Sequence, residues 1–220
     1  MEWKRDKEEE NKKELEEKIK NNLDIEQNKT LKKIFVFLGV FILIITLWVI
    51  FINSTKHFEY RGITGNVIKE GELIFYQTTV PMKYQGEWVD YNIFLRNSPK
   101  SLERIPFDGE INLLHNMVLE SEEEFSCDGK GIISIVNLKN LYNVVGTKVI
   151  KDENATCDPE GRYMFLRIQN GDVTSIEQVG PACYNLNVNN CEILEVTEKF
   201  MVETLVKANE IVNENKENFS

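Results

Sequence analysis

The sequence has little of the material from which catalytic and metal sites are usually built. It has only two histidines, His57 and His115, and neither has a cysteine or carboxylate neighbour at metal-ligand spacing. It contains no Gly-x-Ser-x-Gly, His-Glu-x-x-His, Cys-x-x-Cys or glycine-rich phosphate loop. We therefore assign no catalytic, cofactor-binding or metal-binding residue from the sequence.

An excess of positive charge is also missing. The chain has 26 basic and 36 acidic residues, which gives a formal charge of −10. Proteins that bind nucleic acid neutralise its phosphates with a basic face. This balance therefore excludes nucleic acid as an expected partner and is typical of an acidic surface that keeps a protein soluble.

The chain does contain one long run without charge, residues 34–52. As a helix this run would be about 28 Å long, close to the thickness of the bilayer hydrocarbon. Since lipid offers no hydrogen bonds to the backbone, we predict a transmembrane helix in contact with the lipid bilayer. A buried core helix and a cleaved signal peptide are the alternatives. The run is too long for the apolar part of a typical signal peptide, and no small-x-small cleavage site follows it, so we favour a signal anchor.

Basic residues and cysteines predict the orientation of this helix. Among the 18 residues on each side, five basic residues come before the run and three after it, namely Lys18, Lys20, Lys29, Lys32 and Lys33, then Lys56, Arg61 and Lys69. The positive-inside rule therefore places the N-terminus in the cytoplasm. All four cysteines follow the run, as expected for an oxidising exterior. Both observations predict a single-pass protein of the cell membrane with an extracytoplasmic C-terminus.

These features divide the chain into five expected parts. They are a charged cytoplasmic tail (1–33), the transmembrane helix (34–52), a linker (53–57), an extracytoplasmic domain (58–212) and a frayed C-terminus (213–220). The tail has ten basic and ten acidic residues, with Glu–Lys pairs at helical spacing. It is either a solvated arm or a helix that docks a protein partner. The first is favoured because a coiled coil needs more apolar positions.

The expected fold of the extracytoplasmic domain is α+β, with a mixed or antiparallel sheet crosslinked by disulfides and a packing helix at the C-terminal end. Two hairpins are expected, one around the turn Tyr84–Glu87 and one around Asn170-Gly171, where both turn residues would have positive φ. The expected strands are 73–80, 88–95, 110–119, 132–138, 147–150, 162–169, 172–179 and 184–188, and the expected helices are 97–106, 139–146 and 190–212.

The last of these helices has a broad apolar face that would dock on the core. The pattern places Glu192, Glu195, Glu198 and Lys199 largely off that face. Asn189 and Glu192 have the spacing of a capping box, so Asn189 or Asn190 is expected to begin the helix.

Four cysteines allow three disulfide pairings, and the Asn170-Gly171 hairpin favours one of them. In a two-residue loop, Cys157 and Cys183 come within one residue of facing each other. Cys183 and Cys191 are at the edge of disulfide range if a straight strand begins at Cys183. We therefore expect Cys157–Cys183 and, by elimination, Cys127–Cys191.

Two other groups of residues are candidate sites. Asn154 begins an Asn-x-Thr glycosylation sequon on a loop with many turn residues. The same loop alternates oxygen-bearing residues from Asp152 to Asp158, as a calcium loop does, but lacks its glycine and its final glutamate. Glycosylation of Asn154 is therefore the favoured interpretation.

Three phrases of the chain, residues 58–62, 91–106 and 183–200, resemble membrane-anchored proteins of uncharacterised function from small-genome, symbiont-type archaea. The resemblance covers about residues 58–207 and implies a cell-surface location without a known activity. We therefore expect a surface module that binds a partner or has a structural role. The alternative is a membrane-tethered enzyme whose carboxylates meet only in the fold, with Glu192, Glu195 and Glu198 or the run 122–124 as candidates.

Overall fold

The structure is a computed structural model that describes residues 31–52, 56–121, 125, 127–152 and 154–217. The chain divides into two compact units, Met1–Ser54 and Thr55–Ser220, which are described separately. The boundary lies inside the linker expected at 53–57. The predictions for most of the cytoplasmic tail, for the run 122–124 and for the last three residues lie outside the described part of the chain.

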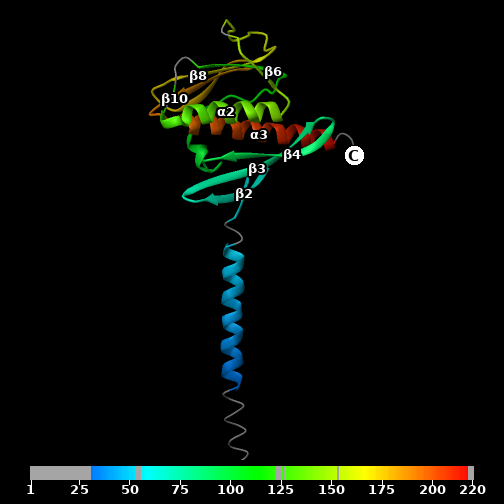
Figure 1. Cartoon of the computed structure of the whole chain (residues 1–220), viewed down its shortest axis with the longest axis vertical. Helices are drawn as coiled ribbons and strands as arrows, with labels where there is room; N and C mark the ends of the chain where they lie inside the picture. The colour runs from blue at the N-terminus through cyan, green and yellow to red at the C-terminus, as the bar shows by residue number, and fades with distance from the viewer. Residues whose placement is uncertain (1–30, 53–55, 122–124, 126, 153, 218–220) are drawn as a thin grey trace, which may run out of the picture. The chain divides into compact units, whose positions relative to one another are not determined.

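The described part of the first unit is a single helix, Leu31–Ile52 (Figure 1). It has 22 residues, a mean hydropathy of 3.1 and none of its apolar window buried. The expectation of one continuous apolar helix is therefore confirmed. A helix of this length is about 33 Å long, enough to cross the hydrocarbon of a bilayer. Length and hydropathy alone fit a membrane span and a signal sequence equally.

The second unit contains a four-stranded antiparallel sheet, called sheet A here, with the strands in chain order. The predicted hairpin at its end is confirmed, with both strands longer than expected. Gln85 and Gly86 form its turn and both have positive φ, so the turn matches the twist of the strands. The strands are β1 (His57–Tyr60), β2 (Ile63–Glu70), β3 (Leu73–Tyr84) and β4 (Glu87–Leu95).

A second sheet, sheet B, has six strands in the order β5-β9-β10-β8-β6-β7 among the described residues. It is mixed, because β10 pairs with β8 in parallel and with β9 antiparallel. The predicted mixed α+β architecture is therefore confirmed. The strands are β5 (Phe107–Asp108), β6 (Asn116–Ser121), β7 (Lys148–Ile150), β8 (Met164–Asn170), β9 (Ser175–Gly180) and β10 (Cys183–Val188), with the 3-10 helix η1 (Ser101–Arg104) between the sheets in the chain.

The hairpin predicted at Asn170-Gly171 is wrong, because β10 lies between β8 and β9. Neither Asn170 nor Gly171 has the positive φ that such a turn needs. A Cβ on Gly171 would instead come within 2.7 Å of the Asn187 Cβ, so the glycine allows close approach to β10. Since Tyr184, Leu186 and Val188 are all buried, β10 is stabilised at the centre of the sheet.

The strand predicted at 132–138 is also wrong, because these residues belong to the helix α2 (Lys130–Val144). Its isoleucines and valines favour strands as single residues, but packing decides the outcome. Ser134, Leu138 and Leu141 are fully buried at spacings of four and three, which is the period of a helix. The predicted helix end is confirmed, because Gly146 follows with a φ of 87°.

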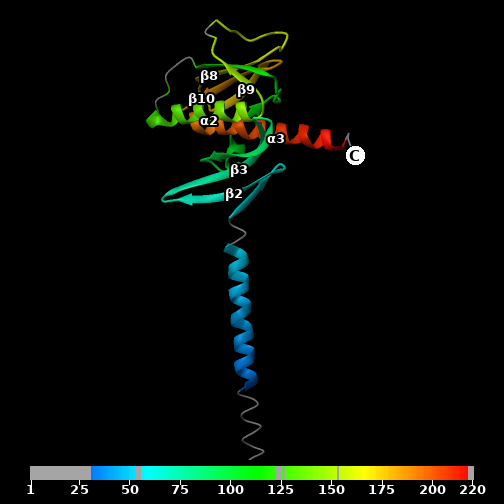
Figure 2. The same ribbon diagram turned by 45° about the vertical axis from the view of Figure 1, so that its right-hand side comes forward.

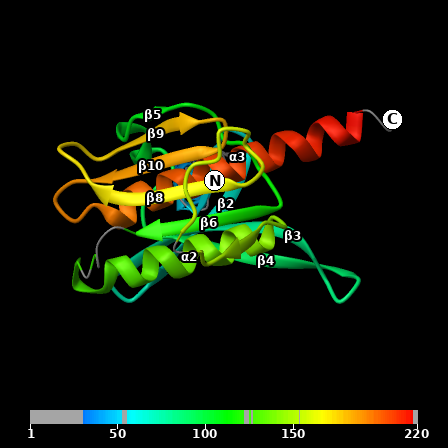
Figure 3. The ribbon, with the colours of Figure 1, turned by 90° about the horizontal axis from the view of Figure 1, so that it is seen from above.

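The helix α3 (Ile193–Glu217) lies with α2 in a layer between the two sheets (Figures 1, 2 and 3). It continues five residues beyond the predicted end at 212. All its residues from Ile193 to Val206 are buried except Glu195. The expectation that Glu198 and Lys199 lie off the packed face is therefore wrong, because sheet A covers the side that a two-layer domain would leave in water.

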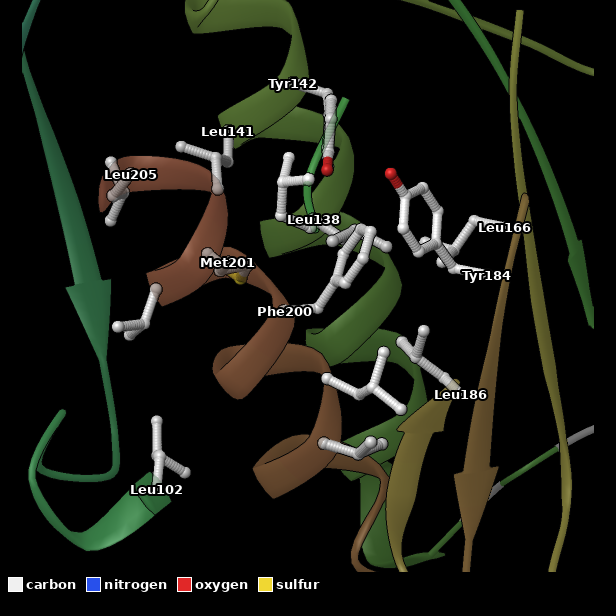
Figure 4. Close-up of a cluster of buried hydrophobic side chains, with 14 of the residues drawn as sticks. Leu102, Leu138, Leu141, Tyr142, Leu166, Tyr184, Leu186, Phe200, Met201 and Leu205 are labelled. Atoms are coloured by element: carbon white, nitrogen blue, oxygen red, sulfur yellow. The ribbon is translucent and has the colours of Figure 1, made fainter. Parts of the chain in front are cut away.

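Aromatic rings connect the middle layer to sheet B. Figure 4 shows Phe200 of α3 beside Tyr142 of α2 and Tyr184 of β10. The ring centroid of Phe200 is 6.2 Å from that of Tyr142 and 5.1 Å from that of Tyr184. All three side chains are fully buried, so the main core is continuous from sheet B through both helices.

The structure contains the disulfides Cys127–Cys191 and Cys157–Cys183, the pairs expected from the sequence. Their Cα–Cα distances are 5.5 and 5.6 Å. The pairing was right but the hairpin argument for it was not, because β8 and β9 are not neighbours. By chain-entropy reasoning, loops of 64 and 26 residues correspond to about 4 and 3.5 kcal/mol of stabilisation.

Candidate functional site

Of the acidic side chains proposed from the sequence, Glu195 and Glu198 lie on the first two turns of α3, between the two sheets, and Glu192 directly precedes the helix. Glu198 is fully buried, whereas Glu192 and Glu195 are partly exposed. A cluster of carboxylates here could bind or transfer protons only if their oxygens were free. Their hydrogen bonds therefore decide what this region can do.

Glu198 binds the backbone of the loop that follows β4. Its Oε1 accepts a hydrogen bond from the Arg96 amide at 2.6 Å, and its Oε2 accepts from the Asn97 amide and the Asn97 Nδ2, both at 2.9 Å. Two chain segments about 100 residues apart are thereby joined by one side chain. Glu198 therefore fixes the end of sheet A to the central helix.

The environment of Glu198 raises its pKa from 4.5 to about 7. Burial is the largest cause, because a carboxylate loses its hydration in the core. The hydrogen bonds from Arg96 and Asn97 act in the opposite direction, and the nearby charge of Glu195 raises the pKa further. Glu198 therefore changes its protonation state near neutral pH, inside a contact between two layers.

An ion-pair network lies one turn further along α3. The Lys199 Nζ is 2.8 Å from the Glu203 Oε1, and the Arg61 Nη1 is 2.7 Å from the Glu203 Oε2. The side chains of Lys199 and Glu203 are almost completely buried, whereas that of Arg61 is half exposed. Burial is the largest single cause and lowers the Arg61 pKa, but the hydrogen bonds to Glu203 and Tyr60 and the charges of these two groups together raise it. This network joins the turn between β1 and β2 to α3.

The other two candidate glutamates, Glu192 and Glu195, do not bind a common group. Glu192 accepts a hydrogen bond from the Thr174 hydroxyl at 2.6 Å and lies 3.8 Å from Arg104. The predicted capping box is wrong, because the Asn189 side chain donates to the Asp172 carbonyl oxygen instead. Among the described residues, the Glu195 Oε2 is buried without a hydrogen-bond partner.

The loop considered for calcium is organised by an internal ion pair. Asp158 is buried and accepts bonds from the Arg162 Nε at 2.9 Å and Nη2 at 3.0 Å. These bonds lower the pKa of Asp158 to about 2. Within the described ranges, no three His, Cys, Asp or Glu side chains form a group suited to a metal ion. Asn154 is exposed on the same loop, as an acceptor of a glycan must be.

A different surface carries two phenylalanines that the sequence analysis did not single out, Phe94, which is exposed, and Phe75, which is half-buried. On the outer face of sheet A, the rings of Phe75 and Phe94 are 6.2 Å apart and the Arg96 guanidinium lies 4.9 Å from the Phe75 ring. Leu73 and Phe94 are 45% and 44% exposed. We call Leu73, Phe75, Phe94 and Arg96 the aromatic face.

A sequence signal for this face was available. Residues 73–76 are Leu-Ile-Phe-Tyr, so apolar side chains occupy both faces of the strand. A strand at the surface of a domain normally alternates apolar with polar residues. The absence of that alternation indicates that the outer face of this strand has a functional role in addition to the packing of its inner face.

No family model, curated protein or solved structure matches this chain. The resemblance to archaeal surface proteins stated above therefore stays a prediction.

Proposed function

We propose that the protein is a membrane-anchored module of the cell surface that binds a partner through the aromatic face. In this proposal the helix Leu31–Ile52 spans the membrane as an uncleaved signal anchor, with the N-terminus in the cytoplasm. The second unit lies outside the cell.

The properties of the apolar helix support the anchor. A core helix would be buried, whereas none of its apolar window is. The lysines before it exceed the basic residues after it, which favours a cytoplasmic N-terminus. Both disulfides belong to the second unit, as an oxidising exterior would produce.

The aromatic face is the observation that carries the binding role. Sheet A already packs its inner face on the helices through buried Ile63, Ile93 and Leu95. Its outer face could therefore be entirely polar without loss to the core, yet it has two phenylalanines with an arginine stacked on one of them. Aromatic residues and arginine dominate the energetics of protein interfaces. Binding at this face accounts for residues that a solvated sheet does not need.

Two carboxylates of α3 support this choice over an enzyme that would use them, whereas the Glu195 Oε2 has no hydrogen-bond partner among the described residues. Glu198 and Glu203 form hydrogen bonds that join segments of the chain to each other. A general acid or base needs a free oxygen within reach of a substrate. These two side chains are accounted for by the structure of the domain alone.

Phe75→Asp tests the proposal in the full-length protein on intact cells. We expect chemical crosslinking to join the wild-type protein to a defined partner and the variant to lose that product, because a charge replaces the centre of the aromatic face. Thr79→Asp is the matched control, since Thr79 is exposed on the same strand and the same face. Equal crosslinking of wild type and Phe75→Asp, with both proteins folded by circular dichroism, would contradict the binding role.

A further inference from the structure

The strand β4 forms one edge of sheet A and has nine residues. Figure 3 shows it along the margin of the sheet, with the tip of the β3–β4 hairpin projecting from the domain. The strand at the opposite edge, β1, has only four residues. A long edge strand presents a row of unpaired amide and carbonyl groups to any strand that can reach it.

The turn of the hairpin determines which groups of β4 point outward. In a two-residue hairpin loop the residues that close the loop, here Tyr84 and Glu87, exchange hydrogen bonds. Paired positions then alternate along the ladder between bonded and non-bonded. The outward amide and carbonyl groups therefore belong to Trp88, Asp90, Asn92 and Phe94. In the described part of the chain, these groups form no backbone hydrogen bond to another element.

Several protective features of a natural edge strand are absent from β4, although it carries two charges, Glu87 and Asp90. Such edges commonly carry lysine, proline or a bulge, or are very short. The sequence of β4, Glu-Trp-Val-Asp-Tyr-Asn-Ile-Phe-Leu, has no lysine or proline, and its register with β3 continues without a shift. Trp88 is 74% exposed at an outward position. The edge is therefore suited to pairing.

We propose that β4 pairs antiparallel with β4 of a second copy of this chain, in a register centred on Tyr91. The two copies of sheet A then form one continuous sheet across a two-fold axis, as in symmetric dimers whose interface is one self-complementary patch. This inference uses the backbone groups at the edge of sheet A, whereas the proposed binding role uses side chains of its outer face; Phe94 belongs to both.

Self-complementarity selects both the partner and the register. Outward groups must bond to outward groups, so only registers that pair Trp88, Asp90, Asn92 and Phe94 among themselves are possible. In the register centred on Tyr91, Trp88 of one copy faces Phe94 of the other, and Asp90 faces Asn92. This register gives aromatic pairs and pairs of a carboxylate with an amide donor. Centred on Asp90, two like charges would face each other, which is destabilising. Centred on Asn92, Asp90 would face the aromatic ring of Phe94.

Disulfide crosslinking of the full-length protein in nanodiscs tests this register. The described cysteines are all in disulfides, so an introduced cysteine is the only free thiol. Trp88→Cys and Phe94→Cys are made as separate variants and mixed before reconstitution. Bonded antiparallel pairs have Cα atoms about 5.5 Å apart, within the range of a disulfide. We expect mild oxidation to shift the mixture to a covalent dimer on a non-reducing gel.

The single variants and a neighbouring position serve as controls. Trp88→Cys alone should stay monomeric on the gel, because the two copies of residue 88 lie six residues apart along the paired strands. Thr79→Cys, on the strand next to β4, should behave in the same way. A dimer of equal intensity in either control, or no dimer in the mixture, would overturn the proposed pairing.

A second variant removes one pairing group of β4 without changing the aromatic pairs. Asn92→Pro deletes one outward amide and leaves the hydrogen bonds to β3 in place, which an edge strand tolerates. We expect particles of the wild type to contain two copies and those of Asn92→Pro one copy, with unchanged circular dichroism. Two copies in both would contradict pairing through β4.

Discussion

Replacement of Glu198 tests whether one buried side chain joins sheet A to the central helix. Glu198→Ala leaves the amides of Arg96 and Asn97 without their acceptor, and each unsatisfied buried donor costs about 1–3 kcal/mol. Because the loop is partly exposed and water can replace some of these bonds, we expect a loss of about 2–4 kcal/mol in the free energy of unfolding. Urea denaturation of the detergent-solubilised protein, followed by the near-ultraviolet circular dichroism of the buried tyrosines, measures this loss.

Glu195→Ala is the matched control for this experiment. It removes the same functional group from the same helix, three residues earlier, but its Oε2 has no partner among the described residues. Loss of an unpaired buried oxygen is close to neutral or stabilising, so we expect a change within about 1 kcal/mol. Equal losses in the two variants would refute the assignment of the stabilisation to the bonds with Arg96 and Asn97.

The pH dependence of stability provides a second test of Glu198. Its pKa is about 7 in the folded protein and 4.5 as the ordinary value, so the folded state retains a proton that the unfolded state has lost in this interval. The contribution of this proton to the free energy of unfolding is therefore complete below pH 4.5 and is lost as the pH rises through 7. The loss corresponds to about 3 kcal/mol. Glu198→Gln does not titrate, so the stability of wild type relative to this variant should fall across the interval. A difference in stability between wild type and Glu198→Gln that stays constant across this pH interval would contradict the predicted fall with rising pH.

Two further predictions concern the ion-pair network and the topology. Glu203→Ala leaves the ammonium of Lys199 buried without a partner and should cost about 3–5 kcal/mol in thermal unfolding, whereas Arg61→Ala should cost about 1 kcal/mol because Arg61 is half exposed. Equal losses would show that Lys199 finds another partner. A cysteine at the exposed position Asn140 should react with a membrane-impermeant maleimide on intact cells, and the peptide with Asn154 should carry the mass of a glycan. Labelling only after lysis would place the second unit in the cytoplasm.

The sequence predicted the elements whose local signals agree with their final environment. The apolar run 34–52 is too long for most other structures, and Gln85-Gly86 has the turn chemistry of a two-residue hairpin. The mixed α+β class follows from several such elements together. None of these features depends on a contact between distant parts of the chain.

The errors occur where distant segments decide the structure. Residues 132–138 have the propensity of a strand, but contacts with α3 stabilise a helix there. The turn at Asn170-Gly171 favours a local hairpin until β10 is inserted between its strands. Glu198 was expected in water because sequence periodicity shows one packed face and cannot reveal a second sheet.

Glu195 and Glu198 were located correctly on one helix, whereas Glu192 precedes it, and the roles of Glu192 and Glu198 depend on partners far away in sequence. Nothing near Glu198 indicates that the amides of residues 96 and 97 end beside it. The aromatic face was within reach of the sequence, because Phe75 interrupts the alternation expected of a solvated strand. The position of β4 at the edge of sheet A could not be predicted from the sequence, because strand order is a property of the sheet as a whole.

The position of α3 in the chain has a consequence for the order of assembly. With α2, this helix forms the layer on which both sheets pack, yet it follows every strand of the second unit in the chain, at Ile193–Glu217. Synthesis proceeds from the N-terminus, so every strand emerges before the helix that buries its inner face. A chain halted before Ile193 would have both sheets and α2 but would lack the other helix of the layer between them. Folding of the second unit therefore completes only after α3 has been synthesised, and the disulfide of Cys191, beside the start of α3, is the later of the two for which both cysteines are present.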